Sequence, residues 1–163
     1  MQRVRVVTVN DFEGLLRCYI EIWESLREWL PNSFVDAELE SVRETESQER
    51  FKQRIKSRDG IFLIAEKNNE IVGVALGQES VGVCNLRFLG VKTEHRRKGV
   101  GASLLDRFVE EAKKRKAHKV SLRTSPNLSP AIKLYIKNGF IPEGFLRKHI
   151  RGLDVIVYSK FLE

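Results

Sequence analysis

A short basic run followed by two glycines is the part of the sequence best suited to do chemistry. Arg96, Arg97 and Lys98 stand directly before Gly99, and Gly101 follows two residues later. An apolar stretch ends before this run and an amphipathic stretch begins after it, so we expect a strand, a turn and the start of a helix. The first N–H groups of a helix lack internal partners, and glycine has no Cβ atom to keep a phosphate away from them. The run therefore predicts a cradle for an anion such as a pyrophosphate.

Two better-known phosphate motifs do not fit this loop. A Walker A loop needs Gly-Lys followed by Ser or Thr, which this run lacks. The dinucleotide fingerprint needs a third glycine at position 104, where the chain has Leu104. A glycine-containing turn with solvated basic side chains is the structural alternative that the spacing alone leaves open.

The elements that must position this loop are indicated by the periodicity of the apolar residues. Alternating or continuous apolar runs predict strands at residues 3–8, 60–66, 70–79, 83–91, 119–123, 143–150 and 153–161. Helical spacing predicts helices at residues 10–30, 35–56, 99–116 and 130–138. The order β-α-α-β-β-β-α-β-α-β-β predicts an α/β fold in a single domain over residues 1–163. Its sheet should be mixed and mostly antiparallel, with helices on both faces.

The composition excludes several classes of protein. Of the 163 residues, 42% are hydrophobic and 31% are charged, a balance that fits neither a disordered nor a membrane chain. No apolar run approaches the ~20 residues of a membrane span, and the first ten residues do not resemble a signal peptide. The two cysteines, Cys18 and Cys84, are too few for a disulfide scaffold or a zinc site. We therefore expect reduced thiols, no metal site and a cytoplasmic protein.

Charge is distributed unevenly along the chain. The net charge is +7, but residues 20–50 carry nine acidic and three basic side chains, which leaves +13 on the remainder. A basic surface attracts a polyanion such as a phosphorylated cofactor, and the acidic stretch would attract a cationic substrate. A solvated helix face is the alternative explanation of the acidic stretch.

Two motifs in this chain resemble those of the GNAT superfamily of acetyl-CoA-dependent N-acetyltransferases. Residues 96–101, Arg-Arg-Lys-Gly-Val-Gly, resemble the family motif Arg/Gln-x-x-Gly-x-Gly/Ala. Residues 131–140 resemble the second signature, Ala-x-x-Leu-Tyr-x-x-x-Gly-Phe. The two motifs stand in the family's order, and the expected elements match the GNAT fold over nearly the whole chain. The resemblance implies acetyl-CoA as co-substrate.

The resemblance also implies roles for individual residues. Backbone amides of the loop would hold the pyrophosphate, the preceding strand would pair with the pantetheine arm, and a tyrosine hydroxyl would point at the thioester sulfur. In this chain the loop residues are Arg96, Arg97, Lys98, Gly99, Val100, Gly101 and Ala102, the strand residues are Leu89 and Val91, and the tyrosine is Tyr135. Many members carry an Asn seven residues before the tyrosine, where this chain has Leu128. Asn127, one residue earlier, is the expected cofactor contact, and the alternative is that it only caps the helix that follows.

Acetyl transfer to an amine needs a proton donor for the leaving thiolate and a route for the proton that the amine loses. Tyr135, with a reference pKa of about 10, is protonated at neutral pH and can act as the donor. A half-buried helix aromatic is the structural alternative for this residue. For the proton that the amine loses, the sequence offers several candidate acceptors.

Many members of the family place a Glu on the strand that corresponds to residues 83–91. Here that strand offers only Asn85 and Arg87. Glu79, Glu24 and Glu28 are the candidates to contact the substrate or to accept its proton through water. A solvated surface acid is the alternative for each of the three.

The sequence thus predicts an N-acetyltransferase that moves an acetyl group from acetyl-CoA to a primary amine by direct attack, with Tyr135 as general acid. The acidic stretch favours a cationic acceptor, which could be a protein N-terminus, a lysine or a polyamine. Two other classes remain open: a catalytically silent acyl-CoA-binding module and a basic nucleic-acid-binding domain. We expect neither a membrane nor a nucleic acid as partner, and the sequence leaves a homodimer open.

Overall fold

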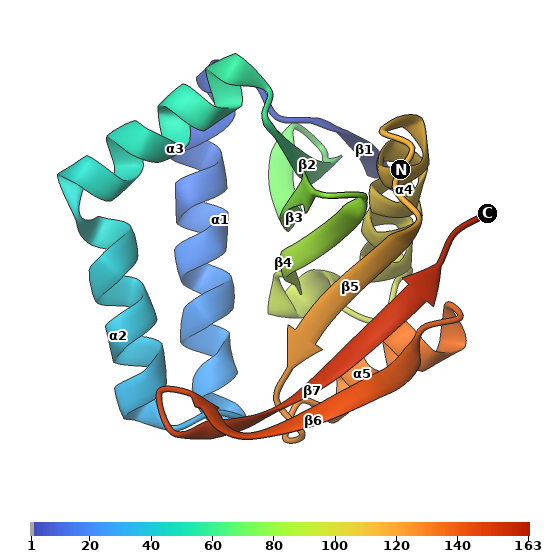
Figure 1. Ribbon diagram of the computed structural model, residues 1–163. Helices are drawn as coiled ribbons and strands as arrows, with labels where there is room; N and C mark the ends of the chain where they lie inside the picture. Colours follow the sequence, from blue (N-terminus) through green and yellow to red (C-terminus); the bar gives the residue numbers. More distant parts are fainter. Residues whose placement is uncertain (1) are drawn as a thin grey trace.

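The computed structural model describes residues 2–163, which form a seven-stranded sheet and its covering helices (Figure 1). The strands are β1 (Gln2–Val6), β2 (Gly60–Lys67), β3 (Glu70–Ser80), β4 (Val83–Val91), β5 (Lys119–Thr124), β6 (Ile141–Ile150) and β7 (Leu153–Phe161). The helices are α1 (Phe12–Ser25), α2 (Asn32–Arg43), α3 (Thr45–Ser57), α4 (Val100–Lys114) and α5 (Ser129–Lys137), with the 3-10 turns η1 (Val9–Asp11), η2 (Leu26–Glu28) and η3 (Thr93–His95). None of the helices among these residues is long and apolar enough to cross a membrane.

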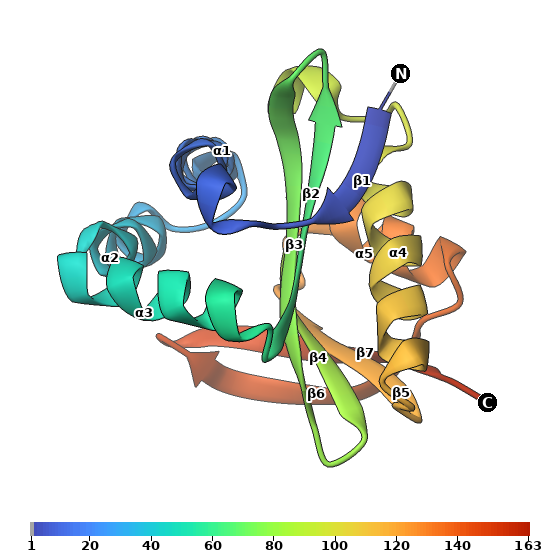
Figure 2. The same cartoon turned by 90° about the horizontal axis from the view of Figure 1, so that it is seen from above.

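The sheet confirms the predicted mixed, mostly antiparallel arrangement. Its strands lie in the order β1-β2-β3-β4-β5-β7-β6. Every neighbouring pair is antiparallel except β4 and β5, which run parallel. Seen from above, α1, α2 and α3 lie on one face of the sheet, and α4 and α5 lie on the other (Figure 2). Helices therefore cover both faces, as the sequence predicts.

The single helix expected at residues 35–56 is wrong, because the structure has two helices there. α2 and α3 meet at Glu44, whose backbone is extended at φ −68° and ψ 128°. Val35 and Leu39 of α2 pack with residues from the end of α1, whereas Ile55 of α3 packs with residues of the sheet. The two apolar stripes face different clusters, so the chain bends at Glu44 to bury both.

The parallel pair of β4 and β5 stays together over only part of its length. The paired register runs from Val83 with Lys119 to Leu86 with Leu122 and then stops. Beyond this point β4 continues beside β3, and β5 continues beside β7 as far as Thr124. The two strands therefore part after Leu86, which leaves the facing edges of β4 and β5 without strand partners.

The largest hydrophobic cluster lies between the sheet and α4 and holds that helix in place. Phe108 and Leu104 of α4 are fully buried in it. A Cβ atom at Gly77 of β3 would lie 2.5 Å from the ring of Phe108, so the helix and the strand approach closely here. Fully burying a side chain of this kind stabilises a fold by about 1.5–3 kcal/mol. This packing fixes α4 with its first turn beside the parting of β4 and β5.

Candidate active site

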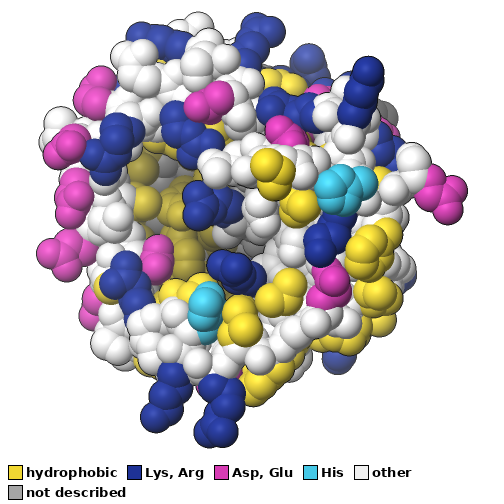
Figure 3. All heavy atoms as spheres, viewed as in Figure 1, with side chains coloured by type: hydrophobic (Ala, Val, Ile, Leu, Met, Phe, Trp, Pro, Cys, Tyr) yellow, Lys and Arg dark blue, Asp and Glu magenta, His cyan; other side chains and the backbone are white. Residues whose placement is uncertain are grey.

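The parting of β4 and β5 opens a cleft of about 1180 Å³ that is lined from both faces of the sheet. On one face the lining comes from the first turn of α4 and from α5. On the other face it comes from α1, η2, α2, α3 and the hairpin of β6 and β7. Figure 3 shows this second side as a hollow with a hydrophobic floor. A ligand lying between the strands can therefore present its end to a second ligand that enters from the opposite side.

The loop between β4 and α4 has the conformation of an anion cradle. Arg97 (φ 60°) and Gly99 (φ 82°) both lie in the left-handed region, just before α4 begins at Val100. Within residues 2–163, the backbone N–H groups from Arg97 to Ala102 donate to no other group. The hydrogen bond that follows them runs from the Ser103 N–H to the Gly99 carbonyl oxygen at 3.0 Å. Free N–H groups at the positive end of a helix suit a pyrophosphate.

The structure favours glycine at the two positions of the loop for different reasons. A Cβ atom at Gly99 would meet nothing within 4 Å, but the φ of 82° there is unfavourable for any other residue. A Cβ atom at Gly101 would lie 3.2 Å from Cδ2 of Leu134, so this glycine lets α4 and α5 approach each other. Backbone conformation at Gly99 and helix packing at Gly101 are therefore reasons for glycine in addition to the predicted clearance for a phosphate.

The three basic side chains of the loop point in different directions. Arg97 is exposed, lines the cleft and makes no ion pair within the described chain. Arg96 also lines the cleft, but its guanidinium donates to the Val91 carbonyl oxygen at 2.9 Å and to Ser25 Oγ at 2.6 Å. These bonds tie the loop to β4 and α1. Lys98 donates to the Glu94 carbonyl oxygen instead and does not line the cleft.

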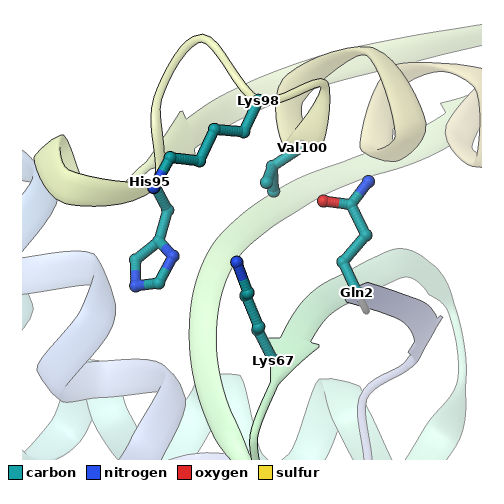
Figure 4. Close-up of a pocket in the computed structure, with 5 residues that line it drawn as sticks. All are labelled: Gln2, Lys67, His95, Lys98 and Val100. Carbon is teal, nitrogen blue, oxygen red and sulfur yellow. The ribbon is translucent and has the colours of Figure 1, made fainter.

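Behind the loop lies a smaller pocket of about 230 Å³, between the loop and the first two strands (Figure 4). His95 and Lys98 line it from the loop, Val100 lines it from the start of α4, and the ammonium group of Lys67 points into it from β2. The pocket shares no lining residue with the cleft. The expected cofactor contacts of Lys98 and Val100 therefore depend on their backbone N–H groups alone.

Tyr135 lies on α5 and lines the cleft. Its ring is 7% exposed and packs against Phe140 and Tyr158, at centroid distances of 5.9 and 6.4 Å. Burial raises the pKa of Tyr135 well above its ordinary value of 10.0, so the hydroxyl stays protonated at neutral pH. Among residues 2–163 the hydroxyl has no hydrogen-bond partner, which leaves it free for a ligand in the cleft.

The predicted strand residues lie in the cleft, whereas Asn127 does not. Leu89 and Val91 line it on the part of β4 where the edge toward β5 is unpaired. The backbone N–H of Asn127 donates to Ser125 Oγ at 3.2 Å in the turn before α5. Leu128, at the N-cap of α5, lines the cleft instead. The expected contact between Asn127 and the cofactor stays a prediction without support from this geometry.

Of the three predicted acidic residues, only Glu28 lines the cleft. Glu24 pairs with Arg27, and the hydrogen bond from Arg27 lowers the pKa of Glu24. Glu79 accepts a hydrogen bond from the Gly82 N–H in the turn between β3 and β4. Glu28 is therefore the acid of this set that a substrate in the cleft can reach, and the roles of all three stay predictions.

Aromatic rings line the hollow, although the sequence pattern indicates only core positions for them. The rings of Tyr19 and Phe88 lie 4.4 Å apart, and those of Trp23 and Phe34 lie 6.1 Å apart. All four residues line the cleft. Tyr19 and Trp23 belong to the apolar stripe of α1. Part of that stripe lines a cleft because β4 and β5 part beside it. Helical periodicity alone does not distinguish these cleft residues from core residues.

The sequence matches a known family and a curated protein. A model of the Acetyltransferase (GNAT) family matches residues 23–140, a range that includes both the loop and Tyr135. An N-alpha-acetyltransferase from Sulfurisphaera tokodaii is 30% identical over 112 residues, which is 61% of this chain and 67% of that protein.

Solved structures share the fold over nearly the whole chain. The PaiA N-acetyltransferase from Thermoplasma acidophilum, in complex with coenzyme A, has a TM-score of 0.83 at 22% identity and covers 99% of each chain. The ribosomal-protein-alanine N-acetyltransferase from Brucella melitensis has a TM-score of 0.79 at 24% identity, covering 98% of this chain and 99% of its own. At these identities the likeness shows a common fold.

Proposed function

The chain belongs to the acetyltransferase (GNAT) family and is an acetyl-CoA-dependent acetyltransferase, and we propose that its acceptor is the α-amine of a peptide or protein. The observation that carries this proposal is the cleft between β4 and β5, with a phosphate cradle on one side and an open hollow on the other. An open hollow suits a chain end, whose amine enters first while the rest of the polypeptide stays in solvent. The Sulfurisphaera tokodaii relative is an N-alpha-acetyltransferase, which supports the same choice.

A lysine side chain and a polyamine are the other acceptors that the sequence leaves open. A polycation would need unpaired negative charge beside the hollow. Several acids of residues 20–50 are instead engaged in ion pairs: Glu24 pairs with Arg27, and Glu38 pairs with Arg151. In Figure 3 a row of acidic side chains lies along the outer edge of this face, over α2 and α3. Among the described residues, Glu28 is the one acid of the cleft lining without an ion pair or a hydrogen bond, and a single free carboxylate suits one α-amine better than a polycation.

We propose that the free N–H groups of residues 97–102 hold the pyrophosphate of acetyl-CoA. The exposed guanidinium of Arg97 adds positive charge on the approach to this loop. The unpaired edge of β4 at Leu89 and Val91 accommodates the pantetheine arm, and Arg96 keeps the loop in position through its bonds to β4 and α1. Acetyl-CoA supplies the thioester from which the acetyl group is transferred.

Tyr135 is the proposed general acid. Its hydroxyl is protonated at neutral pH at the ordinary pKa of a tyrosine, and burial raises that pKa further. A free thiol titrates near ~8.5, so a donor that remains protonated above neutral pH assists departure of the thiolate. The ring is held by Phe140 and Tyr158, which fixes the direction of the hydroxyl.

Glu28 is the proposed acceptor-side acid. It lies in η2 at the end of α1, is exposed and lines the cleft. An α-amine has a reference pKa of about 7.7–8.0, so part of the acceptor is already neutral near pH 7 and a strong base is not required. A carboxylate reached through water is sufficient to remove the remaining proton.

A panel of amines with acetyl-CoA, followed by thiol release, tests the proposal. The panel contains a peptide with a free α-amine, a lysine peptide with a blocked N-terminus and a polyamine. We expect the free α-amine to give the highest kcat/KM. A higher kcat/KM for either of the other two would contradict the choice of acceptor. Thioester binding without turnover of any amine would instead indicate the silent acyl-CoA-binding module, which the absence of a Glu from β4 favours.

The proposed cytoplasmic location is supported by the state of the two cysteines. Cys18 and Cys84 are both free and buried, and burial raises the pKa of Cys18 to about 12. A thiol in such surroundings is neutral and unreactive, and reduced cysteines are typical of cytosolic proteins. Fractionation of the source cells, with the chain detected by antibody, tests this location. Recovery in an extracellular fraction would contradict it.

A further inference from the structure

Two arginines stand at the point where β4 and β5 part. The last paired residues of the parallel register are Leu86 and Leu122, and Arg87 and Arg123 are the next residue of each strand. Leu122 belongs to the cluster beneath α4, so the alternation of a strand turns Arg123 toward the side of α1 and α2. Arg87 is the bulged residue of β4 and has no register partner on β3. Both side chains are exposed and both line the cleft.

Neither guanidinium is neutralised by the protein. Within the part of the chain that the structure describes, Arg87 and Arg123 make no ion pair and no side-chain hydrogen bond. Arg54, which lines the same cleft, is by contrast paired with Asp59. Two unpaired positive charges in one cleft repel each other, and an anion that both of them contact offsets that repulsion. The pair is therefore suited to a ligand that brings negative charge.

The acidic side chains of the cleft do not supply the negative charge that would neutralise the two arginines. Three acidic side chains line it: Glu28, Glu38 and Asp154. Glu38 is paired with Arg151, and Asp154 accepts the backbone N–H of Lys148 at 2.9 Å. None of the three makes an ion pair with either arginine. The cleft therefore combines aromatic rings with the guanidinium groups of Arg87 and Arg123, which are unpaired within the described residues.

We infer that Arg87 and Arg123 bind a carboxylate of the acceptor, so that the preferred substrate is a peptide with Asp or Glu directly after its N-terminal residue. The inference rests on the proposed function, because it concerns the same acceptor. A guanidinium presents a planar fork that binds a carboxylate through two parallel hydrogen bonds, and such charged bonds are stronger than neutral ones. The carboxylate would hold the peptide with its amine directed toward the parting of the strands.

Matched peptides test this inference. Two peptides differ only at the second residue, Asp in one and Asn in the other, and the full-length chain is assayed with each in the presence of saturating acetyl-CoA. We expect kcat/KM for the Asp peptide to exceed that for the Asn peptide by about tenfold or more, mainly through KM. The double variant Arg87→Gln with Arg123→Gln should bring the ratio close to one.

Three controls separate charge, geometry and folding. Arg87→Lys keeps the charge but loses the planar fork, so its ratio should fall between those of the wild type and Arg87→Gln. Arg3→Gln, on the exposed side of β1 and outside the cleft, should keep the wild-type ratio. The affinity for CoA, measured by calorimetry, verifies that each variant is folded.

The outcomes distinguish the inference from the proposed function. Equal kcat/KM for the two peptides with the wild type, or an Asp preference that survives in the double variant, would overturn the inference and leave the proposed function intact. If CoA binds but neither peptide is acetylated, the proposed function fails and the inference fails with it. An Asp preference that disappears in the double variant and persists in Arg3→Gln supports the inference.

Discussion

At the scale of single residues, the hydroxyl of Tyr135 is the group whose removal changes chemistry with the least change in packing. Tyr135→Phe keeps the ring contacts with Phe140 and Tyr158. General acid catalysis contributes about 10²–10⁴-fold, and we expect a fall in kcat near the lower end because water can replace the donor. The affinity for CoA should not change. Steady-state kinetics and calorimetry measure the two quantities.

Tyr158→Phe is the matched control, because this ring packs on Tyr135 but does not line the cleft. Its kcat should remain that of the wild type. A Tyr135→Phe variant that turns over as fast as the wild type, under conditions where acetyl transfer limits the rate, would remove this hydroxyl from the mechanism.

Gly101 allows the pyrophosphate cradle to be tested with two variants. Gly101→Ala and Gly101→Asp add the same Cβ atom, which approaches Leu134 at 3.2 Å, but only Asp adds negative charge beside the free N–H groups. Like charges about 4 Å apart near a protein surface repel by roughly 4 kcal/mol. We therefore expect the Kd for CoA to rise at least about tenfold more in Gly101→Asp than in Gly101→Ala. Equal Kd values for the two variants would contradict the cradle.

Single residues differ in how well the sequence predicts them. The loop could be predicted because its function depends on residues that are neighbours in the chain, from Arg97 to Ala102. The predictions for Glu79 and Asn127 rest on position along the chain alone, and the structure gives both residues contacts in turns outside the cleft. Arg96 shows the same limit, because its partner Ser25 is 71 residues away.

At the scale of elements, a cluster of charges joins the first strand to the first helix. Arg5 of β1 donates to the two oxygens of Asp11 at 2.7 and 2.8 Å and pairs with Glu66 of β2. Asp11 also accepts the Thr8 N–H at 2.7 Å, which closes η1 ahead of α1. These contacts, with that of Arg5 the largest, lower the pKa of Asp11 from 3.8 to about 2.

Because the pKa of Asp11 is depressed in the folded state, its contribution to stability is present above pH 4 and lost as the pH falls toward 2. Asp11→Asn should lower the free energy of unfolding by on the order of 2 kcal/mol at pH 7, and by less at pH 3. Urea denaturation at both pH values measures this difference. Asp106→Asn, at an exposed position on α4, serves as the control. A loss of the same size at both pH values would contradict this assignment.

A helix or strand is predicted well where its whole apolar stripe packs against a single hydrophobic cluster. The stripe of α4 faces a single cluster, and the predicted helix at residues 99–116 agrees with Val100–Lys114 to within two residues at each end. The prediction of a single helix at residues 35–56 is wrong because the two halves of this segment pack against different clusters. The parting of β4 from β5 cannot be predicted from the sequence. The strand pattern of β4 continues past Leu86, and that of β5 continues past Leu122, where the pairing between them ends.

At the scale of the whole molecule, the sequence shows the uneven distribution of charge, and the structure adds which of these charges are paired. Residues 20–50 are acidic, yet many of their carboxylates bind nearby cations, as Glu21 does with Lys92 and Glu46 does with Arg50. Exposed pairs of this kind contribute little to stability and weaken the field that a distant ligand feels. A net charge is additive along a sequence, whereas a field at the cleft depends on which charges are paired in three dimensions.

The account as a whole is tested most directly by one peptide that carries both kinds of amine. The peptide has a free N-terminus and one internal lysine, and it is incubated with acetyl-CoA and the full-length chain. Tandem mass spectrometry then locates the acetyl group. The account predicts acetylation of the α-nitrogen, with release of one CoA per acetyl group and a slower reaction for Tyr135→Phe. Acetylation of the lysine ε-nitrogen, or no acetylation by a chain that binds CoA, would contradict it.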